Sequence, residues 1–243
     1  MARVQQTVGL YAGGKVNLYF DVVKGGSLEE TGGIDKGVFQ HLLRELPESL
    51  EDLRALDLGC GDGRWSEVLH GRGAAEVIAL DRSIEMLARA FQRGKDHGLD
   101  RLSLLLGDMQ ELPLRDSSVH LALASFCLMY FRDLNPTMGE IARVLVPGGS
   151  LFIATNLVEV YPSDLACHLE GKVFPIEVRL GDHDILQLDN VVQPLRWYLD
   201  AFRAAGLSIQ SYAKFAPEGL TVAADYSRRS NLQLSKAMFH LVR

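Results

Sequence analysis

The stretch Ala55-Leu-Asp-Leu-Gly-Cys-Gly-Asp-Gly-Arg64 decides the fold expected for this 243-residue chain. A short apolar run carries Asp57, and glycines then follow at every second position, at Gly59, Gly61 and Gly63. Glycine adopts positive φ without strain and lets the backbone approach a ligand closely. A helix that starts after such a loop offers unpaired N–H groups and the positive end of its dipole. An ordinary strand-to-helix turn does not need three glycines, so the loop predicts a nucleotide-type binding site.

Apolar runs and amphipathic segments alternate on both sides of this loop. Strands are expected at residues 53–58, 76–80, 101–106, 119–125 and 149–156, with closing strands at 207–215 and 236–242. Helices are expected at residues 34–46, 64–70, 84–93, 136–145 and 194–205, by apolar spacing and by Ser83 and Pro136 at helix starts. This alternation predicts a mostly parallel sheet with helices on both faces.

The segment 157–192 breaks the alternation, because it holds two prolines and the polar stretch Gly181-Asp-His-Asp184. We interpret it as an insertion over the ligand edge of the sheet. The expected organisation is one domain, residues 1–243. Its parts are an N-terminal cap (1–50), a cofactor-binding core (51–156), the acceptor-side insertion (157–192) and a closing helix and strands (193–243).

Composition narrows the class of protein. The 25 Lys and Arg against 31 Asp and Glu give a net charge of −6, which weighs against broad binding to nucleic acid. The longest apolar run, residues 121–131, is too short to span a membrane. Cys60, Cys127 and Cys167 are odd in number and lack metal-ligand spacing, so we expect a reducing, cytoplasmic location and no metal site.

The glycine spacing also indicates the kind of nucleotide. A dinucleotide fingerprint, G-x-G-x-x-G, would need glycine where Arg64 stands, and no phosphate-binding G-x-x-x-x-G-K-[ST] loop is present. The loop therefore suits a ligand without a phosphate, such as an amino acid joined to a nucleoside.

With these motifs, the chain resembles the class I S-adenosylmethionine-dependent methyltransferases in their small-molecule branch, most closely over residues 53–155. The resemblance implies that the loop at 56–63, Asp57 included, wraps the methionine part of the cofactor. It implies that Asp81, about twenty residues beyond the loop, accepts hydrogen bonds from both ribose hydroxyls. Arg82 and Met86, from the same matching stretch, are also expected to contact the cofactor.

Two later segments carry the same resemblance. In Leu106-Gly-Asp-Met-Gln-Glu-Leu-Pro113, Asp108 would accept from the adenine amino group and the Met109 backbone N–H would meet a ring nitrogen. Ala124-Ser-Phe-Cys-Leu-Met-Tyr130 would lie beneath the transferred methyl group, with Ser125 among the cofactor contacts. Its lack of prolines argues against methylation of the exocyclic amines of bases.

Several further positions resemble site residues of the family but have other interpretations as well. Tyr11 resembles the tyrosine of a cap that folds over the cofactor, but a lone tyrosine often only packs. His120 stands where relatives often carry Asp and is interpreted as a structural residue. Met129 replaces a polar residue of many relatives, which puts acceptor activation by this segment in doubt. Trp197 and Tyr198 could line an acceptor pocket, although a helix stripe packed on the sheet is the commoner explanation.

A general base is optional for methyl transfer, and the best candidate is His183, which lies between Asp182 and Asp184. His168 is a further candidate, and a solvated loop is the competing interpretation for all four residues.

We therefore expect a Rossmann-like, doubly wound α/β fold with a seven-stranded, mostly parallel sheet, an antiparallel last strand, a helical N-terminal cap and an insertion after strand five. The expected function is methylation of an N, O or C atom of a small molecule by in-line displacement, converting S-adenosyl-L-methionine to S-adenosyl-L-homocysteine. The alternatives are a non-catalytic or repurposed cofactor-binding protein, an RNA or protein methyltransferase and, more distantly, a nicotinamide dehydrogenase. No nucleic-acid or membrane partner is expected, and the oligomeric state stays open, a homodimer included.

Overall fold

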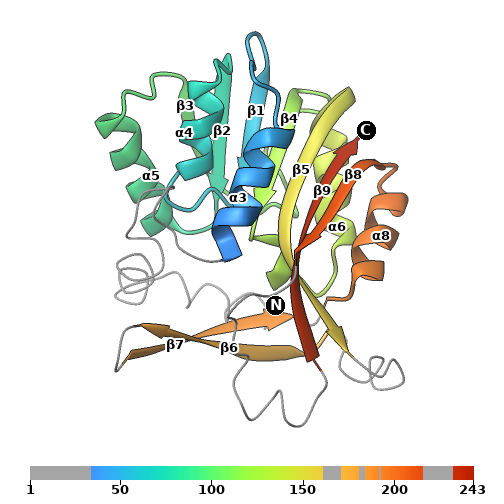
Figure 1. The fold of residues 1–243 in the computed structure, drawn as a ribbon. Coiled ribbons are helices and arrows are strands. Elements are labelled where there is room, and N and C mark those ends of the chain that lie inside the picture. Colours follow the sequence, from blue (N-terminus) through green and yellow to red (C-terminus); the bar gives the residue numbers. More distant parts are fainter. Residues whose placement is uncertain (1–33, 161–170, 181–183, 192, 216–231) are drawn as a thin grey trace.

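A computed structural model describes residues 34–160, 171–180, 184–191, 193–215 and 232–243. A seven-stranded sheet runs through these residues in the order β3-β2-β1-β4-β5-β9-β8, and β6 and β7 form a separate antiparallel hairpin (Figure 1). The strands are β1 (Arg54–Leu58), β2 (Glu76–Asp81), β3 (Leu102–Leu106), β4 (Val119–Ser125), β5 (Leu145–Val160), β6 (Val173–Leu180), β7 (Asp184–Val191), β8 (Ser208–Phe215) and β9 (Leu232–Val242).

The directions of the strands confirm the predicted fold class. Strands β1 to β5 pair in parallel, whereas β9 is antiparallel to both of its neighbours, β5 and β8. The strand order reverses between β1 and β4, and in open α/β sheets ligands bind beyond the carboxyl ends of the strands at such a point. The fold thus locates the ligand site beyond Leu58 and Ser125.

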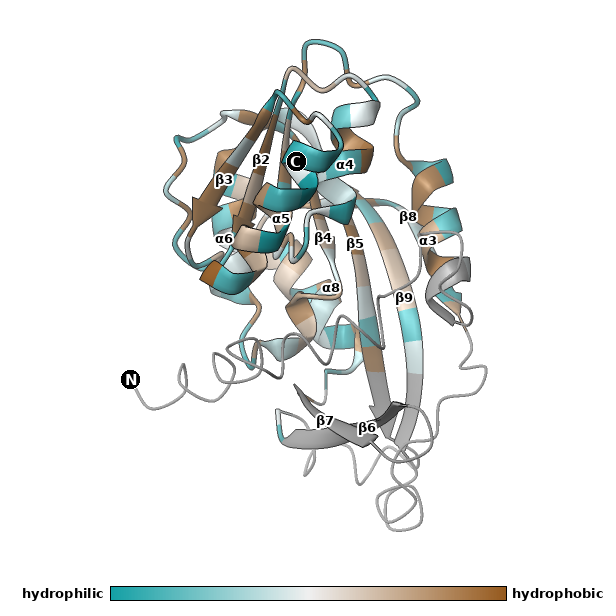
Figure 2. Cartoon of the chain, turned by 90° about the vertical axis from the view of Figure 1, so that its left-hand side faces the viewer, coloured by the Kyte–Doolittle hydropathy of each residue, from teal (hydrophilic) through white to brown (hydrophobic). Residues whose placement is uncertain are grey.

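Helices cover both faces of the sheet (Figure 1). They are α3 (Ile34–Glu45), α4 (Arg64–Gly71), α5 (Ile84–Asp96), α6 (Asn135–Val144) and α8 (Leu195–Ala204), with a short 3-10 turn, η1 (Leu128–Tyr130). One buried cluster joins the sheet to α3 and α4, and another joins it to α6 and α8. The strands are accordingly mostly apolar, apart from a hydrophilic band on β9, and the outward helix surfaces are largely hydrophilic (Figure 2). Among the described residues, no helix is long and apolar enough to cross a membrane.

Strand β5 is longer than the sequence predicts. Leu145 pairs with Val119 and Ser150 pairs with Leu121, so four residues of β5 face a single residue of β4. These are residues 146–149, and Pro147, Gly148 and Gly149 among them are residue types typical of turns. The structure forms that turn as a bulge inside β5, with Gly148 at φ 79°.

At its other end β5 continues past the sheet edge. Its pairing with β4 ends at Ala154, and β8 pairs with β9 only up to Lys236. Beyond this level, β5 and β9 pair only with each other, as far as Val160 and Leu232. We call this two-stranded extension, residues 157–160 and 232–235, the β5–β9 ribbon. The predicted insertion at residue 157 therefore begins inside a strand, and most of the rest of its described part is the β6–β7 hairpin (Figure 1).

The face of the sheet that α8 covers contains a series of buried polar side chains joined by hydrogen bonds. The Tyr198 hydroxyl is 2.7 Å from Thr155 Oγ1 and donates to Gln193 Oε1, and Tyr198 and Gln193 are fully buried. Gln193 Nε2 donates to the carbonyls of Leu128 and Phe131 in the segment after β4. Tyr198 thus packs in the core, as the helix-stripe interpretation predicted, and it anchors the segment after β4.

Tyr198→Phe is expected to lower the free energy of unfolding by about 1–3 kcal/mol, because Thr155 and Gln193 would keep buried polar atoms without their shared partner. Urea unfolding measures the change. Tyr212→Phe, at a partly exposed ring of β8, is the matched control. Equal stability of the two variants would contradict a structural role for the buried chain.

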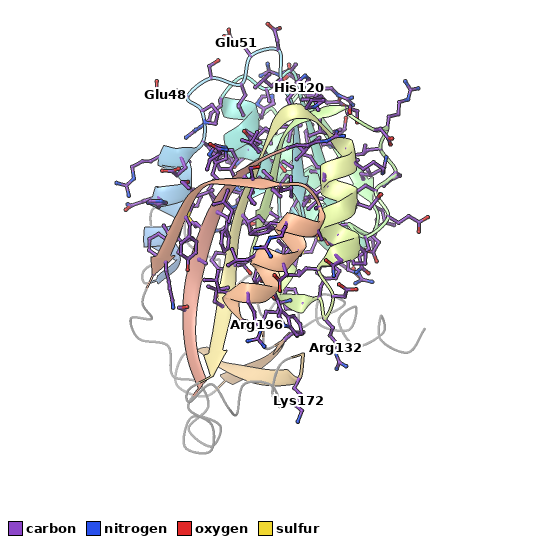
Figure 3. The ribbon with its side chains drawn as sticks, turned by 90° about the vertical axis from the view of Figure 1, so that its right-hand side faces the viewer. Glu48, Glu51, His120, Arg132, Lys172 and Arg196 are labelled. Carbon is purple, nitrogen blue, oxygen red and sulfur yellow. The ribbon has the colours of Figure 1, made fainter. Side chains whose placement is uncertain are left out.

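His120 is structural, as predicted. Its Nδ1 accepts a hydrogen bond from the backbone N–H of Arg54, 3.1 Å away, at the amino end of β1. It lies at the opposite end of the molecule from Arg132, which follows the carboxyl end of β4 (Figure 3).

Candidate functional site

The glycine loop between β1 and α4 depends on its glycines for two different reasons. Gly59, Gly61 and Gly63 have φ values of 62°, 56° and 83°. A Cβ on Gly59 would lie 2.6 Å from Cys127 Cβ, and one on Gly63 would lie 3.2 Å from Ala90 Cβ. A Cβ on Gly61 would meet nothing within 4 Å. Close packing therefore excludes a side chain at Gly59 and crowds one at Gly63, whereas Gly61 borders open space.

Asp81 links this loop to the next helix. Its Oδ2 accepts from the Gly61 N–H and its Oδ1 from the Ser83 N–H, both at 2.9 Å. Ser83 Oγ in turn accepts from the Met86 N–H and caps α5. A carboxylate oxygen can accept more than one hydrogen bond, so Asp81 retains capacity for hydroxyl donors. Met86 is 3% exposed, so its side chain packs in the interior. The cofactor contact predicted for Met86 stays a prediction.

Two more carboxylates hold the loop from inside. Asp57 is 1% exposed and accepts from Ser66 Oγ at 2.6 Å, which ties β1 to the first turn of α4. Asp62 pairs with Arg64 and Arg93, and Arg93 also donates to the Asp62 carbonyl oxygen at 2.9 Å. Sequence reasoning missed Ser66 and Arg93. Arg93 lies 31 residues from Asp62, and no local pattern indicates that the two residues pair.

The segment after β3 lies against the same loop. Asp108 accepts from the Gln110 N–H, and its Oδ2 is 3.9 Å from Arg82 Nη2. Met109 Cε is 3.5 Å from the position of a Cβ on Gly59. Arg82 Nε is buried and has no hydrogen-bond partner among the described residues. The structure therefore brings together the three segments that the sequence assigned to one cofactor.

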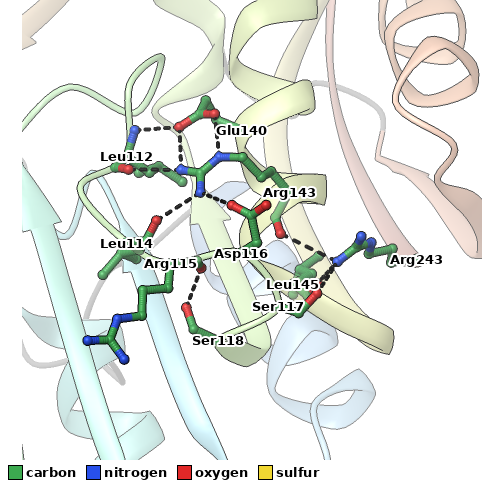
Figure 4. A network of polar contacts seen from close by, with 10 residues as sticks. All are labelled: Leu112, Leu114, Arg115, Asp116, Ser117, Ser118, Glu140, Arg143, Leu145 and Arg243. Atoms are coloured by element: carbon green, nitrogen blue, oxygen red, sulfur yellow. Dashed lines mark hydrogen bonds and ion pairs between the residues drawn. The ribbon is translucent and has the colours of Figure 1, made fainter.

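An arginine network fixes the loop between β3 and β4 (Figure 4). Arg143 donates to the carbonyls of Leu112 and Leu114 and pairs with Asp116, while Glu140 Oε2 accepts from the Leu112 N–H at 2.7 Å. The hydrogen bond from Arg143 lowers the pKa of the Glu140 carboxyl. The loop that begins at Asp108 is thereby anchored to α6.

A strained residue follows strand β4. Ser125 is partly exposed, and Phe126 follows with φ 52°, a conformation that bulky side chains rarely adopt. The Phe126 N–H donates to the Ala154 carbonyl at 2.7 Å, and Lys236 Nζ lies 4.9 Å from its ring centroid. Backbone strain of this kind gathers at functional sites, so this corner is a candidate part of the site.

Two thiols lie under the loop. Cys127 Sγ is 3.2 Å from the Leu58 carbonyl oxygen, and Cys60 is 8% exposed. Burial raises the pKa of both thiols, and the carboxylates of Asp57 and Asp81 raise it further. Both thiols are therefore protonated at neutral pH and are poor nucleophiles.

We expect Cys60 and Cys127 to resist iodoacetamide at pH 8 in the folded protein and to react after denaturation, as peptide mass spectrometry would measure. Because their folded pKa values lie above the unfolded value of about 8.5, their contribution to stability is complete below that pH and declines as the pH rises further. Modification of the folded protein at the rate of a free thiol would contradict this prediction.

Several predicted residues are not tested by these contacts. Tyr11, His168, Asp182 and His183 lie outside the described residues, and only the backbone of Asp184 is described, at the start of β7. Strand β7 packs against η1, which puts the β6–β7 hairpin beside the segment after β4. In the part of the chain that the structure describes, no group of three or more His, Cys, Asp or Glu could hold a metal ion.

Met129 is buried and Trp197 is partly exposed, and both lie near this hairpin. Met129 is 7% exposed, and Asn156 Nδ2 lies 3.0 Å from its sulfur. Trp197 lies against the backbone of Gly171, 3.1 Å from the position of a Cβ there.

The fold and the loop define a class of protein, an α/β domain with a glycine loop and carboxylates at the switch point of its sheet. Residues 56–153 match a family model described as a methyltransferase domain. This match agrees with the resemblance to the class I S-adenosylmethionine-dependent methyltransferases that the same segment carries.

The curated relatives match this domain over part of their length. Malonyl-[acyl-carrier protein] O-methyltransferase of Xylella fastidiosa is 36% identical over 165 residues, which cover 61% of this chain and 55% of that protein. The enzyme of the same description from Pectobacterium atrosepticum is 39% identical over 103 residues, 42% of this chain and 38% of that one. The chain thus spans about half or less of the length of these relatives.

Solved structures share the fold over most of the chain. The [4+2]-cyclase SpnF has a TM-score of 0.71 at 18% identity and covers 98% of this chain and 95% of its own. Geranyl diphosphate C-methyltransferase from Streptomyces coelicolor A3(2), in a complex that contains S-adenosyl-L-homocysteine, has a TM-score of 0.65 at 17% identity, covering 86% and 79%. At these identities the likeness concerns the fold alone.

Proposed function

We propose that this protein binds S-adenosyl-L-methionine at the carboxyl ends of β1 to β4 and transfers its methyl group to a small-molecule acceptor. The observation that carries the proposal is the hydrogen bond between the Gly61 N–H and the Asp81 carboxylate, beside Asp108. It brings a glycine loop, a carboxylate suited to a diol and a second carboxylate to one edge of the sheet. The match of residues 56–153 to a methyltransferase domain supports it.

The described residues fit such a cofactor. Gly61 leaves space where any other residue would project a side chain, and Arg82 Nε is a buried donor that still lacks a partner among the described residues. In the proposal, Asp81 accepts from the ribose hydroxyls, Asp108 accepts from the adenine amino group and the Met109 N–H meets a ring nitrogen. The glycine loop encloses the methionine part, with Asp57 bracing it from below.

The chemistry would depend mainly on positioning. The bound cofactor supplies an electrophilic methyl group on a sulfonium, and attack in line with the S–CH3 bond disperses its positive charge. Holding two reactants in near-attack geometry can contribute about 7–11 kcal/mol. The residues after β4, from Ser125 to η1, would form the floor beneath the methyl group, and Gln193 and Tyr198 hold that floor in place. His183 stays the candidate general base for an acceptor that must lose a proton.

The acceptor is proposed only by class. The curated relatives are described as acting on a malonyl group held by acyl-carrier protein, which favours transfer to the oxygen of a carboxylate. A second candidate follows from the likeness to SpnF, described as a cyclase. The same fold could bind the cofactor without transferring its methyl group.

Calorimetric titration with S-adenosyl-L-methionine, S-adenosyl-L-homocysteine and NAD tests the proposal. We expect micromolar binding of the two sulfur ligands and none of NAD. Methyl transfer is then measured with cofactor labelled in its methyl group and a malonyl thioester as acceptor. Binding without transfer across a panel of acceptors would favour the non-transferring candidate, and no binding would overturn both.

A further inference from the structure

Exposed apolar side chains gather where α5 packs on β3, at one edge of the sheet. The most exposed large hydrophobic side chains among the described residues are Ile84, at 60%, and Phe91 and Leu106, each at 56%. Ile84 and Phe91 belong to α5, and Leu106 ends β3, the outermost strand on this side (Figure 1). Apolar side chains that are exposed together, rather than singly, mark an interaction surface.

Two of these residues belong to a row of four exposed positions along α5. We call this row the α5 stripe, and its members are Ile84, Ala88, Phe91 and Lys95. At 3.6 residues per turn, their directions from the helix axis fall within about 60° of arc. The side of α5 that carries Leu87 and Ala90 is buried on the sheet, so the stripe faces outward. Lys95 Nζ lies 5.3 Å from the centroid of the Phe91 ring, so the lysine stem follows the stripe.

The spacing of the α5 stripe is the same in both directions, since its members stand four, three and four residues apart. A second α5 that packs antiparallel to the first therefore sets Phe91 opposite Ala88, and Ile84 opposite Lys95. The small Ala88 leaves room for the Phe91 ring, and the two-fold symmetry makes this contact twice. The aliphatic stem of Lys95 can cover Ile84 while its ammonium group stays in water. The stripe thus complements itself, as a two-fold interface between identical chains requires.

The charges beside the stripe are complementary in the same arrangement. Glu85 lies in the first turn of α5 and Lys95 in the last, and both are exposed. In the antiparallel pair, Glu85 of one copy lies about one residue, or 1.5 Å along the axis, from the level of Lys95 of the second copy. Glu85 Oε2 accepts from Ser83 Oγ at 2.9 Å, and a carboxylate can accept further hydrogen bonds. Asp96, next to Lys95, points about 100° further round the helix and accepts from Gln92 Nε2.

We propose that two copies of this protein associate through the α5 stripe, with their α5 helices antiparallel about a two-fold axis. The inference goes beyond the proposed function and does not depend on it. Ile84 directly follows Ser83, whose N–H donates to Asp81, so the interface would begin beside the proposed ribose carboxylate. One pair of short helices buries less surface than most stable dimers do, so we expect a dissociation constant in the micromolar range.

The first test is sedimentation velocity of the full chain between about 5 and 500 µM, a range that includes weak interfaces of this kind. We expect the average mass to rise from that of one copy toward that of two. Ala88→Arg puts a long charged side chain at the centre of the contact and should weaken association at least tenfold. The matched control is Ala204→Arg, the same exchange at an exposed alanine of α8, and it should associate as the wild type does.

Charge reversal tests the antiparallel arrangement itself. Glu85→Lys and Lys95→Glu each set like charges opposite one another twice, so each should weaken association about three- to tenfold at low salt. The double variant restores opposite charges and should return to within about twofold of wild type. The two positions lie about 15 Å apart within one helix, so this recovery can only come from contacts between copies.

Each result supports the inference or overturns it. A wild-type protein that stays monomeric at the highest concentration contradicts it, and so does association that persists in Ala88→Arg. A double variant that associates no better than the single ones refutes the antiparallel pairing. Far-UV circular dichroism and thermal unfolding of every sample show that the variants are folded, so a loss of association is not a loss of structure.

Discussion

Replacing Gly59 by alanine is expected to lower the free energy of unfolding by about 2–5 kcal/mol. The added methyl group would lie 2.6 Å from Cys127 Cβ, well inside van der Waals contact, and the backbone there has φ 62°. Either the loop or the segment after β4 must move. For a chain of this size the melting temperature should fall by about 4–20 °C. Affinity for S-adenosyl-L-homocysteine should fall with it, because the displaced residues border the proposed cofactor site.

Gly61→Ala is the matched control, since its φ of 56° is equally unfavourable but its Cβ would meet nothing within 4 Å. Only the backbone strain remains, and we expect a loss of about 1–2 kcal/mol. Thermal unfolding of the two variants, measured side by side, separates packing from conformation. Equal losses would show that the contact with Cys127 does not limit the loop.

Asp81→Asn is expected to weaken cofactor binding at least tenfold. A hydrogen bond to a charged group is worth about 1.5–3 kcal/mol, and each 1.4 kcal/mol corresponds to a factor of ten. The amide that replaces one oxygen would also turn its own N–H groups toward the N–H of Gly61 or Ser83, which now donate to the carboxylate. The loss should therefore appear both in affinity for S-adenosyl-L-homocysteine and in stability.

Asp96→Asn provides the control for this variant. Asp96 lies at the end of α5, is exposed and accepts a surface hydrogen bond from Gln92 Nε2. Calorimetric titration of both variants should show wild-type affinity for Asp96→Asn. Unchanged affinity in a folded Asp81→Asn protein would remove the ribose assignment.

Most helices and strands of the fold could be predicted because the sequence patterns that mark them are local. Strand β4, residues 119–125, appears in the structure with the predicted bounds, since an uninterrupted apolar run between polar ends marks a strand buried on both faces. The start of β5 could not be predicted in the same way. Glycines at 148 and 149 indicate a turn, and only the pairing of Leu145 with Val119 shows that the turn interrupts a strand.

The candidate site likewise contains groups that the sequence predicts and groups that it does not. Its glycines and carboxylates follow the strands directly, so their position at one edge of the sheet follows from the topology. The groups that hold them in place come from distant parts of the chain. Arg93 reaches Asp62 from α5, and Cys127 packs where a side chain on Gly59 would be. Such contacts depend on how helices and strands pack, which periodicity does not reveal.

The β5–β9 ribbon has a consequence for hydrogen exchange. From Ser150 to Ala154, β5 pairs with both β4 and β9, whereas from Leu157 to Val160 it pairs with β9 alone. Amide protons of Leu151 to Ala154 should exchange only on global unfolding. Those of Leu157 to Val160 should exchange through local separation of the two strands, orders of magnitude faster. A single strand would thus report two different opening reactions, one of the whole domain and one of the ribbon that leads to the insertion.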